Sequence, residues 1–252
     1  MSTEIPSARN WFDQGGRAYA RFRPEYPPGV AAFLASEAPD KQIAVDVGCG
    51  NGQLTQLLAP YFARVIGLDP SADQIANVTP NERINYQCAP AEQLPLADKS
   101  VSLITAAQAA HWFNLPAFYQ EVRRIGISGA ILALISYGVL KLEPGLNDCF
   151  QKFYYDEIGP YWPLERKLVD TGYTTINFPF EELTAPSLEI HLEWNLFQFL
   201  GYLLTWSAVQ NAKEAGKEEI LMKFANNMAK AWGNADLNRA ISWPINMRIG
   251  RL

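Results

Sequence analysis

Three glycines at alternate positions could bring the backbone close to a ligand. Gly48, Gly50 and Gly52 follow a short apolar run, and a helical pattern opens at about Asn51. A glycine turn between a strand and a helix allows close approach of a ligand, and the unpaired N–H groups that begin the helix favour an anionic group. Asp69 ends the next apolar run, 21 residues after Gly48. A carboxylate there can accept hydrogen bonds from both hydroxyls of a ribose. The turn and the acid together predict an adenosine-containing cofactor.

The spacing of the glycines distinguishes between two such cofactors. The dinucleotide fingerprint is G-x-G-x-x-G, whereas this turn reads G-x-G-x-G and has Gln53 where the third glycine would stand. Asp46 lies two residues before the first glycine, where its carboxylate would repel a pyrophosphate and attract an ammonium group. Both features favour S-adenosylmethionine, which carries a sulfonium, an ammonium and one carboxylate, over NAD. A turn with a purely structural role is the alternative interpretation.

Alternating strand and helix patterns position these residues. Short, nearly continuous apolar runs alternate with helical segments in the first half of the chain, which predicts an α/β fold around a mostly parallel sheet. Ser71 begins a predicted capping box, and Asn114 is a predicted N-cap, with Pro116 in the first turn of a helix towards Arg124. The predicted strands are Ile43–Val47, Arg64–Leu68, Ile84–Gln87, Val101–Ala106 and Ala130–Tyr137.

The second half of the chain is rich in aromatic residues, and five of the seven tryptophans follow residue 150. No Gly/Ser-rich linker separates the halves, so we expect a cap built onto the sheet within one domain, 1–252. The expected parts are a cofactor-binding core at about 40–137, a cap and substrate region at about 140–235 that is mostly helical between Leu196 and Trp232, and a late strand at 241–249 that returns to the sheet.

Composition disfavours several classes of function. The 252 residues include 21 Lys and Arg and 26 Asp and Glu, a net charge of −5, whereas nucleic-acid binders usually show a basic excess. The three cysteines lie far apart without a C-x-x-C pair, so neither a disulfide framework nor a metal site is expected. The most apolar stretch, Ile125–Leu140, is short for a membrane span, and the amino terminus has no apolar signal region. We expect a cytoplasmic protein with a small-molecule substrate and neither a nucleic-acid nor a membrane partner.

Four segments of this sequence resemble motifs of the class I S-adenosylmethionine-dependent methyltransferases. They are V-D-V-G-C-G-N-G at 45–52, V-I-G-L-D-P-S at 65–71, C-A-P-A-E-Q-L-P-L at 88–96, and the strand-four motif at 100–113. The segment 17–27 and the His111-Trp112 pair are similar to the trans-aconitate methyltransferase-like (methyltransferase type 11) group of small-molecule enzymes. The resemblance covers about residues 10–140. It implies a Rossmann-like fold with about seven mostly parallel strands, helices on both faces, a partly helical aromatic-rich cap, and methyl transfer to a small molecule.

The same resemblance implies roles for individual residues. The implied cofactor contacts are Asp46, Gly48, Gly50 and Gly52 for the methionine part, Asp69 for the ribose, Pro70, Ala91 and Glu92 for the adenine, Gln108 near the sulfonium, and Tyr19 and Arg23 in a segment that closes over the cofactor. The implied substrate contacts are Tyr26, His111 and Trp112. Structural roles are alternatives for several of them: Glu92 as a surface acid, Gln108 as a polar residue that ends a strand, and His111 as a packed histidine.

His111 is one of only two histidines and is the candidate general base. Methyl transfer from a sulfonium is an in-line displacement, for which positioning alone can supply about 7–11 kcal/mol of barrier reduction. A base is needed only where the acceptor carries a proton. The subgroup resemblance and three arginines, Arg17, Arg21 and Arg23, favour O-methylation of a carboxylic acid. The alternatives are a protein that binds S-adenosylmethionine without transferring its methyl group and a nicotinamide-dependent oxidoreductase, which Gln53 disfavours.

Overall fold

The computed structural model describes residues 24–252. The chain forms two compact units, each built from segments that are distant in sequence. The core unit consists of 25–139, 165–190 and 244–252, and the cap unit of residue 24, 140–164 and 191–243. Residues 165–190 therefore group with the core rather than with the cap region expected around them. The reason is local: α7 (Arg166–Asp170) packs against the 3₁₀ helix η2 (Ala110–Trp112), which follows a core strand.

The core unit has the predicted α/β fold. Its further elements are α2 (Pro28–Glu37), β1 (Ile43–Val47), α3 (Gln53–Leu58), β2 (Arg64–Asp69), α4 (Ala72–Ala76), β3 (Ile84–Cys88), β4 (Val101–Ala107), α5 (Leu115–Ile125), β5 (Gly126–Tyr137) and β7 (Glu181–Leu183), together with parts of β8 (Leu188–Trp194) and β9 (Arg239–Arg251).

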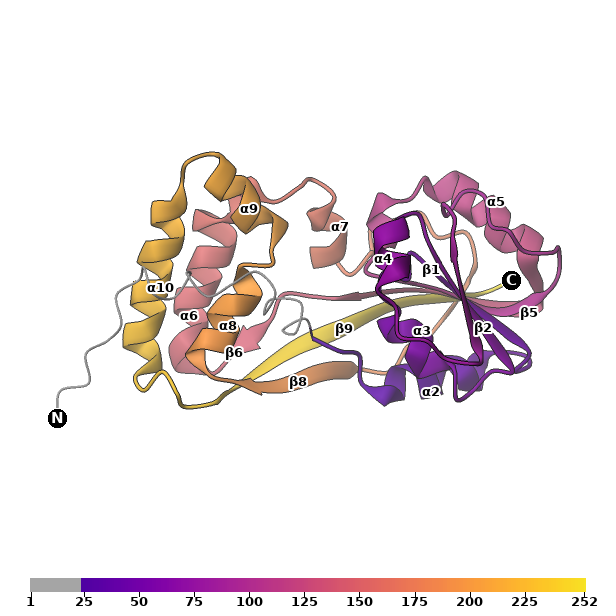
Figure 1. Cartoon of the computed structure of the whole chain (residues 1–252), viewed down its shortest axis with the longest axis horizontal. Coiled ribbons are helices and arrows are strands. Elements are labelled where there is room, and N and C mark those ends of the chain that lie inside the picture. The colour runs from indigo at the N-terminus through magenta and orange to yellow at the C-terminus, as the bar shows by residue number, and fades with distance from the viewer. Residues whose placement is uncertain (1–23) are drawn as a thin grey trace. The chain divides into compact units, whose positions relative to one another are not determined.

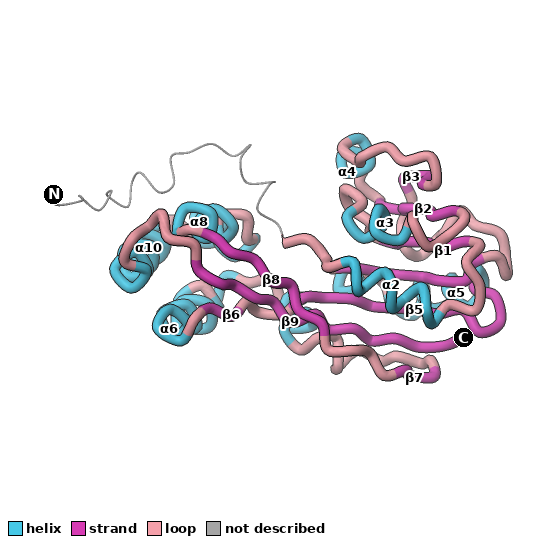
Figure 2. Tube along the Cα trace, turned by 90° about the horizontal axis from the view of Figure 1, so that it is seen from below, coloured by secondary structure: helices cyan, strands magenta, loops and turns pink. Residues whose placement is uncertain are grey.

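Parallel pairing joins strands β3-β2-β1-β4-β5 in that order, and β9 adds to β5 antiparallel. β7 pairs with the carboxyl end of β9, so β5, β9 and β7 run side by side (Figure 2). The five predicted strands are confirmed with small changes at their ends. The largest is that β5 begins at Gly126 rather than at Ala130, because the register between β4 and β5 shifts after Val101, near the positive-φ residue Gly129.

Helices cover both faces of the core sheet. α5 buries Phe118 and Val122 in a hydrophobic cluster with Val45 and Val47 of β1. α2 and α3 lie on the opposite side from α5 (Figure 1). Successive side chains of a strand alternate between faces, so the β1 residue between those two valines points towards α3. That residue is Asp46, and its position on this face determines which residues can donate hydrogen bonds to its carboxylate.

The predicted helix starts are confirmed with one correction. The Asn114 side chain accepts a hydrogen bond from the Ala117 N–H, and α5 follows at once. The Ser71 hydroxyl accepts from the Gln74 N–H in the same way. The capping box at Ser71 is only half formed, however, because the Ser71 N–H donates to Asp69 rather than to the Gln74 side chain.

The cap unit is mostly helical, as predicted between residues 196 and 232. Its elements are β6 (Lys141–Leu142), α6 (Pro144–Lys152), the π-helix η3 (Phe153–Glu157), the 3₁₀ helix η4 (Gly159–Tyr161), α8 (Leu196–Leu203), α9 (Ser207–Glu214) and α10 (Glu218–Trp232), with the remaining parts of β8 and β9. Aromatic rings fill its interior: Phe153 stacks on Phe224 at 3.9 Å between ring centroids, and Phe199 stacks on Trp232 at 5.6 Å. These aromatic residues are core rather than pocket lining.

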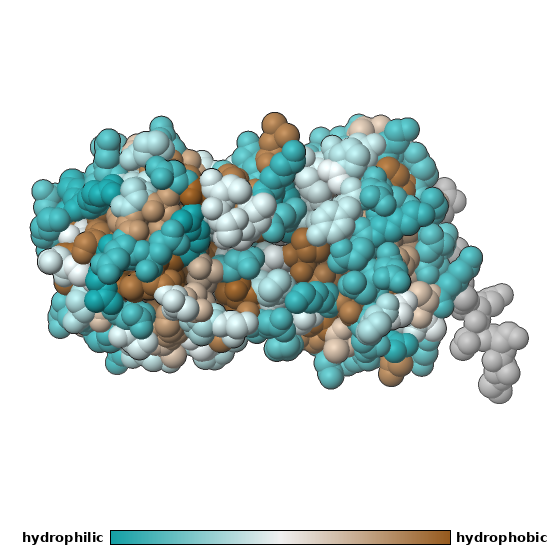
Figure 3. Space-filling view, turned by 180° about the vertical axis from the view of Figure 1, so that it is seen from behind, coloured by the Kyte–Doolittle hydropathy of each residue, from teal (hydrophilic) through white to brown (hydrophobic). Residues whose placement is uncertain are grey.

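Within residues 24–252, no helix is long and apolar enough to cross a membrane. On the face drawn in Figure 3, hydrophobic residues lie in separate patches between hydrophilic ones. The strongly apolar stretch predicted to be a buried strand is β5, whose residues 130–136 are all buried.

Candidate functional site

The glycine turn lies at the carboxyl end of β1, and its three positions require glycine for different structural reasons. All three have positive φ: 69° at Gly48, 54° at Gly50 and 89° at Gly52. A Cβ at Gly48 would lie 2.4 Å from the Cβ of Ala109, and one at Gly52 would lie 2.3 Å from the hydroxyl oxygen of Tyr86. The nearest atom to a Cβ at Gly50 would be 3.8 Å away. Packing within the protein requires two of the glycines, whereas Gly50 leaves its backbone open to a ligand.

Asp69, the predicted ribose ligand, also fastens this turn. One carboxylate oxygen accepts a hydrogen bond from the Gly50 N–H at 2.8 Å, and the other accepts from the Ser71 N–H at 2.9 Å. The residue is 8% exposed. Each carboxylate oxygen has a second lone pair, so the two backbone bonds leave acceptor capacity for ribose hydroxyls. Asp69 therefore orders the glycine turn before any ligand binds.

Asp46 is buried below the turn, where two threonines hold it. Its Oδ2 accepts from the Thr55 hydroxyl of α3 at 2.7 Å, and its Oδ1 accepts from the Thr105 hydroxyl of β4 at 2.8 Å. Burial raises the pKa of Asp46 to about 6, and the two hydroxyl bonds oppose that shift. The carboxylate thus joins β1, α3 and β4 around the start of the turn.

The loop after β3 carries the predicted adenine contacts. Ala91 is buried, and a Glu92 carboxylate oxygen accepts from the Asn114 N–H at 2.8 Å. Arg124 fixes the next part of the loop through its Nη2, which donates to the carbonyl of Leu94 at 2.8 Å. Glu92 is therefore a partly buried residue with a hydrogen bond to the start of α5, and not a plain surface acid. Pro70, the other adenine candidate, is exposed after β2.

Gln108 has an unusual backbone conformation at the end of β4. Its φ is 53°, its N–H donates to the Ile135 carbonyl at 2.8 Å, and its side-chain nitrogen donates to the Tyr137 carbonyl at 3.3 Å. A left-handed conformation is uncommon in a residue with a side chain and is concentrated at functional sites. Both bonds tie Gln108 to β5, so its place beside the glycine turn is well determined.

His111 lies two residues beyond Ala109, the residue that packs on the glycine turn. Its Nδ1 is 2.9 Å from the hydroxyl oxygen of Tyr173. Burial, and secondarily the positive charge of Arg166, lower the pKa of His111 to about 4. The imidazole is therefore neutral near pH 7. Trp112 is 64% exposed, with its ring centroid 4.9 Å from that of His111.

Tyr173 is the site residue that sequence reasoning missed. It is fully buried with a φ of 63°, and it follows Gly172, whose φ is 60°. A Cβ at Gly172 would lie 2.8 Å from Asn246, and Arg248 donates to the Tyr173 carbonyl at 3.2 Å. Both supporting residues come from β9. The local sequence signal was a glycine after a short helix, which indicates a helix end and not a site.

Tyr26 brings a second buried phenol to this region. It is 6% exposed, and its hydroxyl has no hydrogen-bond partner among residues 24–252. Burial raises the pKa of Tyr26 well above its ordinary value, and the neighbouring Tyr137, Tyr173 and Asp46 add to that effect. A buried hydroxyl without a partner is costly unless a ligand or water satisfies it. The Tyr26 hydroxyl thus has hydrogen-bonding capacity that residues 24–252 leave unused.

Comparisons with known proteins agree with this geometry. Residues 45–134 match the Methyltransf_11 family, described as a methyltransferase domain. A protein of Dictyostelium discoideum named as a methyltransferase is 36% identical over 244 residues, which cover 94% of this chain and 92% of that protein. This chain belongs to the class I S-adenosylmethionine-dependent methyltransferases. S-adenosylmethionine is accordingly the cofactor of this methyltransferase, and the oxidoreductase alternative is left without support.

Solved structures extend the similarity of this methyltransferase. A structure described as a type II methyltransferase from Anaeromyxobacter dehalogenans is 40% identical, with a TM-score of 0.85 over 91% of this chain and 97% of that chain. A methyltransferase structure from Bacillus halodurans, 17% identical, shares the fold with a TM-score of 0.51 over 89% of this chain and 97% of that chain. The trans-aconitate-like subgroup stays a prediction.

Two of the predicted cofactor contacts of the methyltransferase, Tyr19 and Arg23, lie outside the described residues 24–252, as do Arg17 and Arg21. The remaining candidates are all in the core unit. Apart from Tyr26, which precedes α2, they gather at the carboxyl ends of β1, β2 and β4 and in the loop after β3, which is where open α/β sheets bind ligands.

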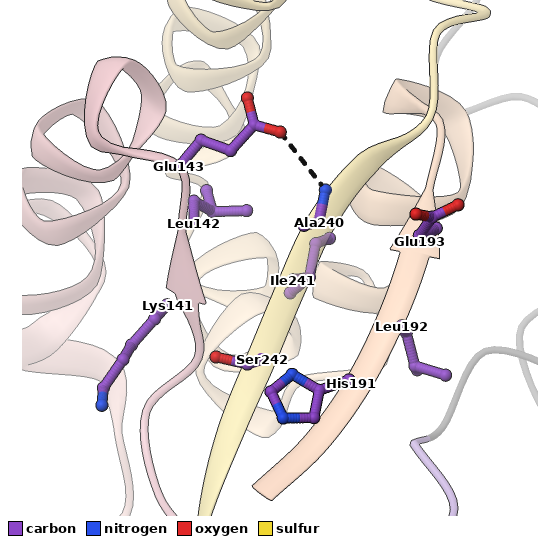
Figure 4. Close-up of a pocket in the computed structure, with 9 residues that line it drawn as sticks. All are labelled: Lys141, Leu142, Glu143, His191, Leu192, Glu193, Ala240, Ile241 and Ser242. Atoms are coloured by element: carbon purple, nitrogen blue, oxygen red, sulfur yellow. Dashed lines mark hydrogen bonds between the residues drawn. The ribbon is translucent and has the colours of Figure 1, made fainter.

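The cap unit of the methyltransferase has a cavity of its own, of about 420 Å³ (Figure 4). Strands β6, β9 and β8 form it, and it contains the second histidine, His191. Its other lining residues are Lys141, Leu142, Glu143, Leu192, Glu193, Ala240, Ile241 and Ser242. Charges of both signs line it, and none of the predicted site residues does. Among residues 24–252 no group of histidine, cysteine and acidic side chains could hold a metal ion.

Proposed function

We propose that this methyltransferase transfers the methyl group of S-adenosylmethionine to a carboxylate oxygen of a small organic acid. The observation that carries the proposal is the state of His111, which is neutral near pH 7 and has its Nδ1 hydrogen-bonded to Tyr173. Tyr173, which contacts His111, and Tyr26, whose ring centroid is 6.0 Å from that of Tyr137, are buried phenols with raised pKa values. Such a site supplies hydrogen-bond donors and little basicity.

The residues of the core unit fit the cofactor. The open backbone at Gly50 would lie against the methionine part, and the remaining lone pairs of Asp69 would accept the ribose hydroxyls. Ala91 and Glu92, fixed to the start of α5, would border the adenine. Asp46 would act on the ammonium group as a nearby buried acid rather than as a direct ligand, because it is 1% exposed and lies below the turn, bonded to two threonine hydroxyls.

The reaction asks the protein mainly for positioning. When bound, S-adenosylmethionine supplies an electrophilic methyl group, to which the acceptor carboxylate oxygen bonds as the carbon–sulfur bond breaks, leaving a methyl ester and S-adenosylhomocysteine with no proton to move. The chain holds the acceptor in line and donates hydrogen bonds to the carboxylate. Gln108, fixed to β5 at the end of β4, would border the reacting atoms.

The acid–base state of the site selects the acceptor class. A carboxylic acid has a pKa near 4 and arrives ionised at pH 7, whereas a phenol has a pKa near 10 and must lose a proton before or during attack. A histidine whose pKa is lowered to about 4 is a weak base for that proton. An ionised carboxylate, in contrast, gains from the neutral donors around it.

The test is a panel of small acids incubated with the enzyme and S-adenosylmethionine, with methyl esters detected by mass spectrometry. Di- and tricarboxylic acids, trans-aconitate among them, form the test arm, and the matched amides, phenols and amines form the control arm. We expect esters from acids alone, at a rate that is flat with pH above the pKa of the acceptor. Turnover confined to phenols or amines would contradict the proposal. Cofactor binding without turnover of any acceptor would favour a binding protein that has lost transfer.

A further inference from the structure

A single proton links His111 and Tyr173, and its direction decides what His111 can do. The 2.9 Å contact joins Nδ1 to the phenol oxygen. A neutral imidazole carries one N–H. Either the phenol O–H donates to a bare Nδ1, with the ring proton on Nε2, or an Nδ1–H donates to the phenol oxygen and leaves Nε2 bare.

The surroundings of the phenol favour the first arrangement. Tyr173 is fully buried, and a phenol carries one O–H, which is costly to leave without an acceptor in a buried site. The buried hydroxyl of Tyr26 is hydrogen-bonded to no residue of 24–252, so it does not take the Tyr173 proton. Within that range, Nδ1 is the acceptor that remains for the Tyr173 O–H.

We infer that Tyr173 is a positioning residue, which holds His111 in the tautomer with the proton on Nε2 and so makes His111 a hydrogen-bond donor to the acceptor rather than its general base. The tautomer follows from the contacts alone, and only the donor role towards the acceptor rests on the proposed function. Gly172 and the β9 residues Asn246 and Arg248 hold the tyrosine in its left-handed conformation. The tautomer of His111, and with it the nitrogen that can donate, is thus determined by residues more than 60 positions away in sequence.

The first test reads the tautomer directly and needs no substrate. The chain has two histidines, so protein labelled with ¹⁵N in its imidazole rings gives two ring systems, and His191→Gln assigns them. At pH 7 we expect His111 to show a protonated Nε2 and an unprotonated Nδ1. Tyr173→Phe keeps the ring and removes the donor, so the His111 signals should move towards a mixture of both neutral tautomers. An Nδ1-protonated His111 in the unaltered protein, or an unchanged tautomer in Tyr173→Phe, would overturn the inference.

The second test separates a donor from a base. In His111→Gln the side-chain amide can donate near the position of Nε2 but cannot take a proton, whereas His111→Leu can do neither. With the acid of highest turnover in the panel, we expect His111→Gln to keep kcat/KM within about tenfold of the unaltered enzyme. The leucine variant should lose about tenfold to a hundredfold, the range expected for a hydrogen bond to a charged group. Equal losses in two variants with native circular dichroism would refute the donor role.

The two tests also separate this inference from the proposed function. If no acid is methylated while His111 shows a protonated Nε2 that depends on Tyr173, the acceptor class is wrong and the tautomer stands. If acids are methylated while the tautomer is the opposite one, the acceptor class stands and the role of Tyr173 is refuted.

Discussion

The buried carboxylate of Asp46 makes a sharp prediction about stability and pH. Asp46→Asn replaces the carboxylate by a neutral group of the same shape that can still bond the Thr55 and Thr105 hydroxyls, whose protons can rotate. The pKa of Asp46 is raised from about 3.8 to about 6, chiefly by burial. At neutral pH the folded protein therefore contains an ionised group in an unfavourable place.

The shift of about two pKa units corresponds to about 3 kcal/mol. Because the folded-state pKa lies above the unfolded one, the folded state binds the proton more tightly. The contribution of Asp46 to stability is therefore fully present below pH 3.8 and is lost as the pH rises through 6. Asp46→Asn has no such dependence, so relative to the unaltered protein it should gain about 2 kcal/mol between pH 4 and pH 7, the rest of the shift lying below pH 4.

Urea unfolding of both proteins without cofactor, at half-unit steps between pH 4 and pH 7, measures this gain. The quantity to compare is the difference in free energy of unfolding at each pH, because all other titrations are common to the two proteins. Asp73→Asn, at an exposed position of α4, is the matched control for the change from acid to amide. A difference for Asp46→Asn that does not vary with pH would refute the description of this carboxylate as buried and perturbed.

Three further predictions concern the glycine turn and its surroundings. Gly52→Ala combines positive φ with a clash against Tyr86. In urea unfolding it should lose more stability than Gly129→Ala, where φ is also positive (77°) but a Cβ would meet only Pro39, at 4.0 Å, and which should cost about 1–3 kcal/mol. In calorimetric titration, Asp69→Ala should weaken S-adenosylmethionine binding about tenfold to a hundredfold. Asp69→Asn should weaken it less, since asparagine keeps one hydrogen-bond acceptor for the ribose. Equal losses of affinity in the two variants would argue against the ribose role of Asp69. Arg124→Met should cost about 1–3 kcal/mol of stability by freeing the loop after β3, and Arg124→Lys should not restore it.

The sequence predicted those parts of the site whose geometry is local. The glycine turn and the acid at the end of β2 each follow a strand directly, so their spacing located them, although the residues that pack on Gly48 and Gly52 are distant in sequence. The five core strands were found for a similar reason: burial on both faces makes a strand continuously apolar. The same reasoning failed at the start of β5, because a shift in register between two strands leaves no periodic signal in either one.

The missed features depend on contacts between distant segments. Tyr173 reaches His111 across 62 positions, and its support comes from β9, a further 70 or so residues along the chain. The half-formed capping box at Ser71 has a local origin instead, since the Ser71 N–H donates to Asp69, two residues before it. Propensity rules describe what a segment can do by itself and cannot show which partner a polar group finds when the chain folds.

Several residues of the family motifs stabilise loops of the protein before any ligand binds. Asp69 fastens the glycine turn, and Glu92 fastens the loop after β3 to the start of α5. A variant at either position that loses cofactor binding would therefore have two explanations, a missing contact or a displaced loop. Gly50 differs from both, because a Cβ there would meet no atom closer than the side-chain oxygen of Gln74 at 3.8 Å. A Cβ at Gly50 would project into the space proposed for the methionine part, although its positive φ would add strain. Gly129→Ala introduces a side chain at positive φ away from the proposed cofactor site. A comparison of cofactor binding in Gly50→Ala and Gly129→Ala therefore separates loss of cofactor contact from displacement of a loop more cleanly than any change of the two acids.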